Sequence, residues 1–372
     1  MMLRELSGTE WFFALVTLTL AIGTGWFAGT RRRKRRDRLP PAAAPPEDVS
    51  AGSARPGPAL QTLGRYRIDR EIGRGSMGVV YLGRDPRSDR PVALKTMALG
   101  HEFDGAELVE ARARFFGEAE MARRLSHPDI VATLEAGEDA GLAYIAMEYV
   151  DGHDLQRHAL AEALLPPATV LRTLARAASA LAHAHRQGVV HRDVKPANVL
   201  VNLDAGTVKL TDFGIAHVID ASRTRTGLVL GTPCYMSPEQ MVGDRVDGRA
   251  DLYSLGVVLY QLLTGTLPHR AASMGQLMQQ IANEVAPDVR TVAAHLPETL
   301  ARIVARALEK RPEARYPDGD QFAADLLAAA GPLDAEADAA PPGAVPSGGA
   351  GPPGTPRTAG FGATDPRHNA RH

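Results

Sequence analysis

The sequence predicts an α+β fold of two lobes, a small β-rich lobe followed by a larger α-helical lobe, with one transmembrane helix ahead of them. Three observations support this. Residues 11–29 form an apolar run without a charge. Short β-prone segments fill the first half of residues 66–330, and helical spacing of apolar residues dominates the second half. Strands followed by helices are typical of α+β domains.

The composition is that of a folded, near-neutral protein. The 372 residues are 44% hydrophobic and 23% charged, with a formal net charge of -1, which excludes a wholly disordered chain. One cysteine excludes an internal disulfide framework and a cysteine-based zinc site. The balance of charge also argues against a globally basic nucleic-acid-binding protein, so we expect no nucleic-acid partner.

The apolar run at residues 11–29 predicts a membrane-spanning segment. A helix of this length spans about 28 Å, close to the hydrocarbon core of a bilayer. Residues 31–38 follow with seven basic residues and one acidic residue, the excess expected on the cytoplasmic side. A cleaved signal peptide would carry its positive charge before the run, and a buried core helix would not be followed by this block.

The predicted topology is therefore a single pass through the inner (cytoplasmic) membrane, with the bulk of the chain in the cytoplasm. Residues 1–10 form a short extracytoplasmic N-terminus, and residues 11–30 form the transmembrane helix. Ala21, Gly25 and Gly29 share one face of this helix, which is consistent with a homodimer contact. The alternative is that glycine is simply common in membrane helices.

Two proline-rich segments surround the folded region. Residues 31–65 combine the basic block with a Pro/Ala-rich linker, and residues 331–372 form a Pro/Gly/Ala-rich tail that we expect to be disordered. The domain between them covers 66–330. Strands are expected at 66–72, 79–82, 91–95 and 142–150, and helices at 107–125, 168–187, 250–263, 273–283 and 297–309.

A glycine-rich turn joins the first two of these strands. Gly73, Gly75 and Gly78 follow a GxGxxG pattern, in which backbone N–H groups can approach a phosphate without a Cβ in the way. A dinucleotide-binding fold would need a helix directly after the third glycine, whereas a β-prone segment follows here. Lys95 then lies on the next strand, and Glu118 lies in a helical segment. Alone, either could be an ordinary surface residue.

The strongest signal is the segment 191–198, His-Arg-Asp-Val-Lys-Pro-Ala-Asn. Asp193 supplies a carboxylate that can accept a hydroxyl proton, Lys195 an ammonium for a phosphoryl group, and Asn198 an oxygen ligand for a hard cation. Asp212 follows in a Thr-Asp-Phe-Gly turn and suits a second metal ligand. A structural capping role would account for either motif alone but not for both in this order.

Together these motifs resemble those of the protein kinase superfamily, in the eukaryotic-like serine/threonine branch found in bacteria. The resemblance covers 66–330 and implies a protein-kinase-like fold that binds ATP with Mg²⁺, or Mn²⁺ as the alternative ion, and acts on Ser/Thr of protein substrates. It implies that Lys95 holds the ATP phosphates and pairs with Glu118, that Asp193 is the catalytic base, that Lys195 contacts the γ-phosphate, and that Asn198 and Asp212 hold the metal. The ATP-binding residues it implies are Ile72, Gly73, Arg74, Gly75, Ser76, Met77, Gly78, Val80, Ala93, Lys95, Glu148, Val150 and Leu200, with Met147 as gatekeeper.

The resemblance also implies regulatory and structural positions. Residues 212–239 correspond to the activation segment, in which Thr224 and Thr226 resemble paired autophosphorylation sites, although loops are rich in Ser and Thr anyway. Arg192 would bind the added phosphate, and Thr232 would hydrogen-bond the catalytic residues. The structural positions are Asp251, which would stabilise the catalytic loop, and Glu239 and Arg315, which would form a buried ion pair.

Other interpretations fit less well. A pseudokinase scaffold usually lacks the strand lysine or one of the two aspartates, and all three are present here. A small-molecule kinase would not need the complete activation segment, which docks peptides in this superfamily. Cys234 lies in that segment without an evident basic neighbour, so an unreactive thiol is favoured over a redox sensor. Dual specificity for tyrosine stays open.

Overall fold

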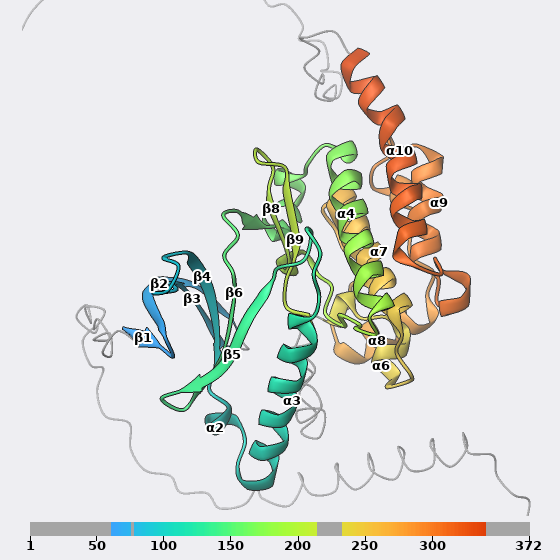
Figure 1. Ribbon diagram of the computed structural model, residues 1–372. Helices are drawn as coiled ribbons and strands as arrows, with labels where there is room; N and C mark the ends of the chain where they lie inside the picture. The colour runs from blue at the N-terminus through green and yellow to red at the C-terminus, as the bar shows by residue number, and fades with distance from the viewer. Residues whose placement is uncertain (1–60, 76–77, 214–232, 340–372) are drawn as a thin grey trace, which may run out of the picture. The chain divides into compact units, whose positions relative to one another are not determined.

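The computed structural model describes residues 61–75, 78–213 and 233–339, and its first half is built on a six-stranded antiparallel sheet (Figure 1). The spatial order of the strands is β1-β2-β3-β4-β6-β5. Their bounds are β1 Thr62–Leu63, β2 Tyr66–Gly75, β3 Gly78–Arg84, β4 Pro91–Met97, β5 Thr133–Asp139 and β6 Leu142–Glu148. β4 is the central strand and is buried from Val92 to Met97, so its side chains reach two different environments.

Successive side chains of β4 point to opposite faces of the sheet. Val92 and Leu94 pack on one face with Tyr66 and Tyr144. Ala93 and Lys95, one position further along, point to the opposite face. Helix α3 (Gly105–Arg123), preceded by the short α2 (Leu99–Glu102), covers this side of the sheet through an apolar cluster that includes Phe115.

The second half is helical and is centred on α7 (Gly248–Thr264). Every residue of α7 from Ala250 to Thr264 is buried, as expected of a helix surrounded by other elements. Asp247 caps its start by accepting the Arg249 N–H, and Gly265 ends it with a positive φ of 71°. The other helices are α4 Pro167–Arg186, α6 Pro238–Val242, α8 Met274–Asn283, α9 Glu298–Ala307 and α10 Gly319–Ala339.

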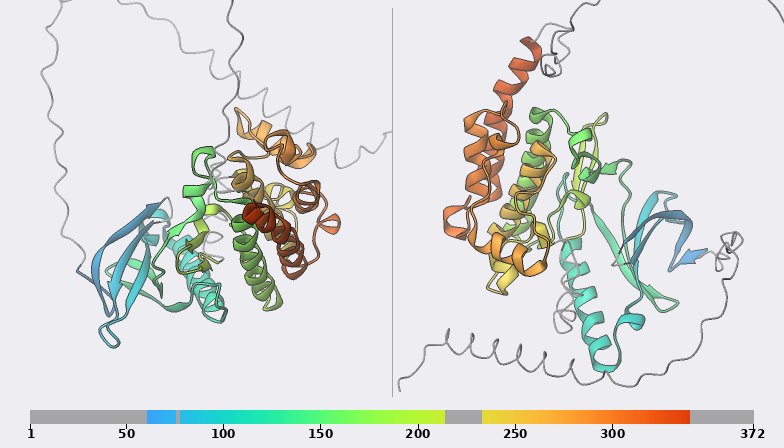
Figure 2. Two further views of the ribbon diagram at one scale, coloured as in Figure 1. Left: turned by 90° about the horizontal axis from the view of Figure 1, so that it is seen from above. Right: turned by 180° about the vertical axis from the view of Figure 1, so that it is seen from behind.

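A small three-stranded sheet lies where the two halves meet. β7 (His153–Asp154), β8 (Val199–Asn202) and β9 (Thr207–Leu210) pair in that order and are antiparallel. Short 3₁₀ turns at Leu155–His158, Ala161–Ala163, Pro196–Asn198, Pro233–Tyr235, Val289–Thr291 and Pro312–Ala314 complete the described chain. Figure 2 shows the large sheet and the helices α4, α7, α9 and α10 as separate halves in both views. The predicted two-lobed α+β fold is confirmed.

Two expectations about the chain's ends need comment. Helix α10 continues to Ala339, beyond the boundary predicted at residue 330, although Pro332 lies inside it. Its first part packs closely on α4, where a Cβ on Gly319 would lie 2.1 Å from the Ala178 carbonyl oxygen. Ala330 is buried and Leu333, just after Pro332, packs on the same core, so tertiary packing outweighs the breaker residue there. Among the described residues, no helix is long and apolar enough to cross a membrane. The predicted transmembrane helix at 11–30 lies outside them.

Candidate active site

The catalytic loop, which contains the motif at 191–198, lies between α4 and β8 and is held in place by α7. Asp251, buried near the start of α7, accepts hydrogen bonds from the backbone N–H groups of His191 (2.8 Å) and Arg192 (2.7 Å). Its Oδ2 also lies 2.7 Å from Nε2 of His185 at the end of α4. One carboxylate therefore ties the loop to two helices, in the position that the sequence analysis expected for Asp251.

The polar side chains of this loop converge on Asp193. Lys195 Nζ lies 2.7 Å from Asp193 Oδ2, and Asn198 Nδ2 donates to the Asp193 carbonyl (2.7 Å) and to Oδ2 (3.0 Å). Because the Asn198 amide nitrogen faces Asp193, its oxygen is the atom that a cation would take. The preceding residue, Arg192, has a φ of 66°, an uncommon conformation for a residue with a side chain.

The predicted ion pair between Lys95 and Glu118 is absent, and Lys95 pairs with Asp212 instead. Lys95 Nζ lies 2.8 Å from Asp212 Oδ2. Burial alone would raise the pKa of Asp212, but the charge and hydrogen bond of Lys95 outweigh it and hold this pKa below its ordinary value. Asp212 has a φ of 65°, and His191 Nε2 bonds the carbonyl of the preceding Thr211 at 2.9 Å.

Glu118 lies half-buried on α3 and forms no ion pair with any residue in the described part of the chain. Its Oε2 is buried and has no hydrogen-bond partner among the described residues. Desolvation raises the pKa of Glu118 to about 7, although the charges of Arg192 and Arg114 act in the opposite direction. The expected pairing was wrong because the sequence places Glu118 on the right helix but does not determine how close that helix comes to β4.

A cleft of about 460 Å³ opens between the two halves next to these groups. Ala93 and Met147 line it and belong to an apolar cluster against which Val80, Val150 and Leu200 pack. The predicted nucleotide residues that line the cleft are Ile72, Gly73, Val80, Ala93, Lys95, Glu148, Val150 and Leu200, joined by Asp212. An apolar slot with carboxylate and ammonium groups at one end suits a purine nucleotide.

The three glycines of the loop differ in what surrounds them. Gly78 has a φ of 134°, and a Cβ there would lie 1.8 Å from the Thr96 carbonyl oxygen, so glycine is required. By contrast, a Cβ on Gly75 would meet nothing within 4 Å, and one on Gly73 would meet only Val80 at 3.9 Å. The protein's own packing therefore does not demand glycine at these two positions, and of the two only Gly73 lines the cleft.

The other predicted loop residues do not line the cleft. Arg74 forms a bidentate pair with Glu71, at 3.0 and 2.7 Å, on its own strand. Gly75 and Gly78 are absent from the lining, and Ser76 and Met77 lie outside the described residues.

The end of β6 forms the wall on which a nucleotide base would lie. The N–H of Glu148 already donates to the Ala132 carbonyl at 2.9 Å, which leaves the backbone carbonyl of Glu148 as the group that can meet a base edge. The Glu148 side chain accepts from the Ala132 N–H and from Lys209 Nζ at 3.2 and 2.9 Å. Lys209 on β9 thus connects the two lobes beside the cleft. Lys209 was not predicted, because a lone lysine on a strand belongs to no motif.

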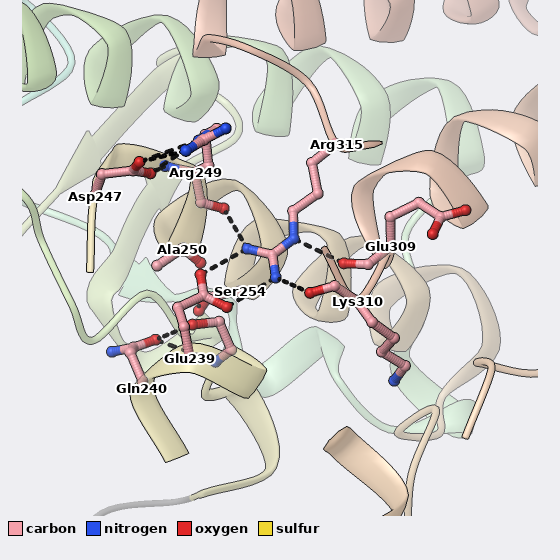
Figure 3. Close-up of polar contacts among 10 residues, drawn as sticks. Glu239, Gln240, Asp247, Arg249, Ala250, Ser254, Glu309, Lys310 and Arg315 are labelled. Carbon is pink, nitrogen blue, oxygen red and sulfur yellow. Dashed lines mark hydrogen bonds and ion pairs between the residues drawn. The ribbon is translucent and has the colours of Figure 1, made fainter. Parts of the chain in front are cut away.

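A buried ion pair joins α6 to the far end of the helical lobe. Arg315 donates from two nitrogens to the Glu239 carboxylate, at 2.7 and 2.8 Å (Figure 3). The same guanidinium donates to the carbonyls of Glu309, Lys310 and Arg249 at 2.7, 2.8 and 3.1 Å. This is the pair that the sequence analysis expected, with all of its donors satisfied.

The comparisons with known proteins agree with this geometry. Residues 66–325 match the protein kinase domain family. The chain belongs to this family. The kinase domain is 41% identical over 289 residues to the serine/threonine-protein kinase PknJ of Mycobacterium tuberculosis, covering 76% of this chain and 47% of that protein. It is 38% identical over 267 residues to the serine/threonine-protein kinase PrkC of Bacillus subtilis, covering 72% and 40%. These relatives confirm that the chain belongs to the bacterial serine/threonine branch of the family.

A solved structure shares the fold. The crystal structure of the Mycobacterium tuberculosis PknI kinase domain superimposes with a TM-score of 0.58 at 32% identity, over 72% of this chain and 97% of that one. The chain spans about half the length of the curated relatives it matches. The matches therefore concern the kinase domain. Residues 1–60 and 340–372 lie outside the part of the chain that the structure describes.

The regulatory positions have separate outcomes. Arg192 lies in the described catalytic loop, directly before Asp193. Thr224, Thr226 and Thr232 lie outside the described residues. Cys234 is half-buried, and desolvation raises the pKa of its thiol, as expected of an unreactive cysteine.

Proposed function

We propose that this chain is a membrane-anchored serine/threonine protein kinase that transfers the γ-phosphoryl group of ATP to protein hydroxyls. The observation that carries the proposal is the convergence of Lys195 and Asn198 on Asp193, beside a cleft that also contains Lys95 and Asp212. These residues supply a proton acceptor, phosphate-binding cations and oxygen ligands within one site.

In the proposed reaction, Asp193 accepts the hydroxyl proton while the hydroxyl oxygen forms a bond to the γ-phosphorus. The bond from that phosphorus to the β,γ-bridging oxygen breaks, and ADP leaves. Lys195, next to Asp193, balances the charge on the transferred group. Asp212 and the oxygen of Asn198 would hold Mg²⁺, which neutralises phosphate charge when bound. Binding of Mg-ATP would require Lys95 to exchange Asp212 for the phosphates.

The direct test is Asp193→Asn in the full chain. The asparagine keeps the size of the side chain and removes the proton acceptor, so phosphate transfer from labelled ATP to a Ser/Thr acceptor protein should fall at least about 100-fold. Binding of ATP, measured by calorimetry, should persist. Transfer by the variant at the wild-type rate would refute the role of Asp193, and an acceptor phosphorylated mainly on tyrosine would refute the substrate class.

Activation by autophosphorylation is the second part of the proposal. A phosphate on Thr224 or Thr226 would add charge near -2, and Arg192 can bind such a group through two parallel hydrogen bonds. Mass spectrometry of active protein after incubation with Mg-ATP should find phosphate on one of the two threonines. Active protein without phosphate at either position would exclude this mechanism.

The third part is location in the inner membrane through residues 11–30, with the kinase domain on the cytoplasmic side. Support comes from the uncharged run and from the seven basic residues in 31–38. Full-length protein should sediment with membranes, resist alkaline extraction and be digested by protease only after the cytoplasmic face is exposed. Release by alkali would exclude a spanning helix. Crosslinking of the wild type against Gly25→Leu/Gly29→Leu would test the dimer contact.

A further inference from the structure

Gln240 connects helix α6 to the catalytic loop. Its side-chain amide nitrogen Nε2 donates to the backbone carbonyl of Arg192 at 2.9 Å. Its oxygen Oε1 accepts from the backbone N–H and the hydroxyl of Ser237, at 3.1 and 3.0 Å. A carbonyl can only accept and a backbone N–H can only donate, so these partners determine which way the amide faces.

The residue that Gln240 contacts has a constrained backbone. Arg192 has a φ of 66° and directly precedes Asp193. Its N–H donates to Asp251 Oδ1 at 2.7 Å, and its carbonyl accepts from Gln240. Both polar groups of this residue are therefore held by side chains, one from α7 and the other from α6. A conformation of this kind persists only where the surroundings determine it.

Helix α6 itself is held in place by the core. Glu239, the residue before Gln240, forms the bidentate ion pair with buried Arg315. Neighbouring residues of a helix point about 100° apart, so one side chain of α6 can reach the core while the next reaches the catalytic loop. Figure 3 shows Glu239 directed at Arg315 and Gln240 directed elsewhere.

We propose that Gln240 is a positioning residue for phosphoryl transfer, which holds the backbone of Arg192, and through it the carboxylate of Asp193, at a place set by α6. The inference rests on the proposed kinase function and adds a residue that touches neither ATP nor the acceptor hydroxyl. Loss of the hydrogen bond from Gln240 to Arg192 should displace Asp193 but leave the nucleotide cleft intact, because Gln240 does not line that cleft. The effect should therefore appear in kcat rather than in ATP affinity.

The chain contains a matched control on another helix. Gln240 is the third residue of α6 after the capping residue Ser237, and Gln276 is the third residue of α8 after Ser273. Gln276 is exposed, and its N–H donates to the Ser273 hydroxyl at 3.3 Å. Gln→Glu at either position places the same charge at the same point of a helix. Only the change at Gln240 removes a hydrogen bond to the catalytic loop.

The experiment compares full-length wild type, Gln240→Glu, Gln240→Met and Gln276→Glu with myelin basic protein as acceptor. We expect both Gln240 variants to lower kcat about tenfold or more, since small displacements of reacting groups are costly. The KM and the calorimetric Kd for ATP should stay within about twofold of wild type. Gln276→Glu should keep the wild-type kcat, and the melting temperatures of Gln240→Glu and Gln276→Glu should stay close to that of wild type. Gln240→Met also loses the two hydrogen bonds from Ser237, so its melting temperature should fall by a few degrees.

The pH dependence supplies a readout that a merely structural role would not change. A protonated glutamic acid can donate to the Arg192 carbonyl, whereas the carboxylate cannot. The kcat of Gln240→Glu relative to wild type should therefore rise as the pH falls from about 8 to about 5.5, and that of Gln240→Met should not.

Three results would overturn the inference. The first is a wild-type kcat in both Gln240 variants, and the second is a loss of kcat in Gln240→Glu that parallels loss of ATP affinity or of thermal stability. The third is a pH dependence of the kcat ratio that is the same for Gln240→Glu and Gln240→Met. A wild-type protein that transfers no phosphate would instead refute the proposed function and the inference with it, so the two failures are distinguishable.

Discussion

Lys95 and Asp212 form an ion pair that joins the two lobes across the cleft. Lys95 Nζ on β4 lies 2.8 Å from Asp212 Oδ2, just after β9, and the side chains are only 10% and 24% exposed. The Asp212 carboxylate thus supplies the negative charge next to Lys95 that the phosphates of a nucleotide would otherwise supply. Asp212 thus holds Lys95 in place, whereas Glu118 Oε2 has no hydrogen-bond partner among the residues that the structure describes.

Lys95→Met should destabilise the nucleotide-free protein, because it leaves Asp212 without a cation. For this partly shielded pair we expect a loss of about 2 kcal/mol in the free energy of unfolding, below the cost for a fully buried pair. Asp212→Asn in the Lys95→Met background should recover part of the loss. Urea unfolding without metal or nucleotide gives this double-mutant cycle, and strictly additive single effects would contradict the coupling.

Glu118→Gln should stabilise the protein, and by more at higher pH. The pKa of Glu118 is raised from 4.5 to about 7 in the folded state, mainly by desolvation. Between these values the folded protein binds more protons than the unfolded chain, so stability falls as the pH rises. A glutamine does not titrate and escapes this loss. The difference in melting temperature between variant and wild type should therefore be small near pH 4.5 and grow up to about pH 8.

A matched control for this prediction lies on the same helix. Glu120 is hydrogen-bonded to Arg123, which lowers the pKa of its carboxyl. Glu120→Gln should therefore show no stabilisation that grows with pH. If the two variants had the same pH profile, burial of Glu118 could not be the cause.

Glu239→Ala should impair folding severely. Burial alone would raise the pKa of Glu239, but the hydrogen bonds and charge of Arg315 outweigh it and keep this pKa below its ordinary value. Removing Glu239 leaves a buried guanidinium uncompensated, which typically costs about 3–5 kcal/mol. Glu298→Ala, which breaks the exposed pair with Arg302, should cost less than about 1 kcal/mol. Equal midpoints of urea unfolding for the two variants would contradict the assignment.

Lys209→Met should weaken ATP binding with little effect on the chemical step. Lys209 Nζ lies 2.9 Å from Glu148 Oε2, where β6 ends at the cleft. The two side chains are 16% and 36% exposed. We expect a partly exposed pair of this kind to contribute about 1 kcal/mol, so the KM for ATP should rise by no more than about fivefold. Lys209→Arg keeps the charge and should restore most of the affinity. A fall in kcat at unchanged KM would point to a different role.

Most of the domain could be predicted because its signals are local. The helix at 105–123 and the long helices of the second lobe follow apolar spacing within one segment, and observed and expected bounds differ by a few residues. The strands β1, β5, β7, β8 and β9 and the helices α2, α6 and α10 were not among the expected elements. Glu135 and Lys209 lie within short polar or mixed segments, and Pro332 indicates a helix end. These elements exist because other parts of the chain pack on them.

The functional groups of the site could likewise be predicted, because they belong to residues that are close together in the sequence. One loop contains Asp193, Lys195 and Asn198. The order of these side chains indicates a phosphoryl-transfer site even when contacts to distant residues are unknown. The same holds for the glycines of the loop at 73–78, which are recognised by their spacing together with the β-prone segment that follows them.

Partners across the lobes are a different matter, because they depend on distances that no local pattern encodes. That Lys95 pairs with Asp212 rather than Glu118 follows from where α3 lies against β4. That Gln240 reaches Arg192 follows from the packing of α6 against the core through Glu239 and Arg315. The kinds of groups at the site are thus set by sequence order, whereas their pairing is set by the rigid-body packing of helices and sheet, in which a shift of a few ångströms exchanges one ion-pair partner for another.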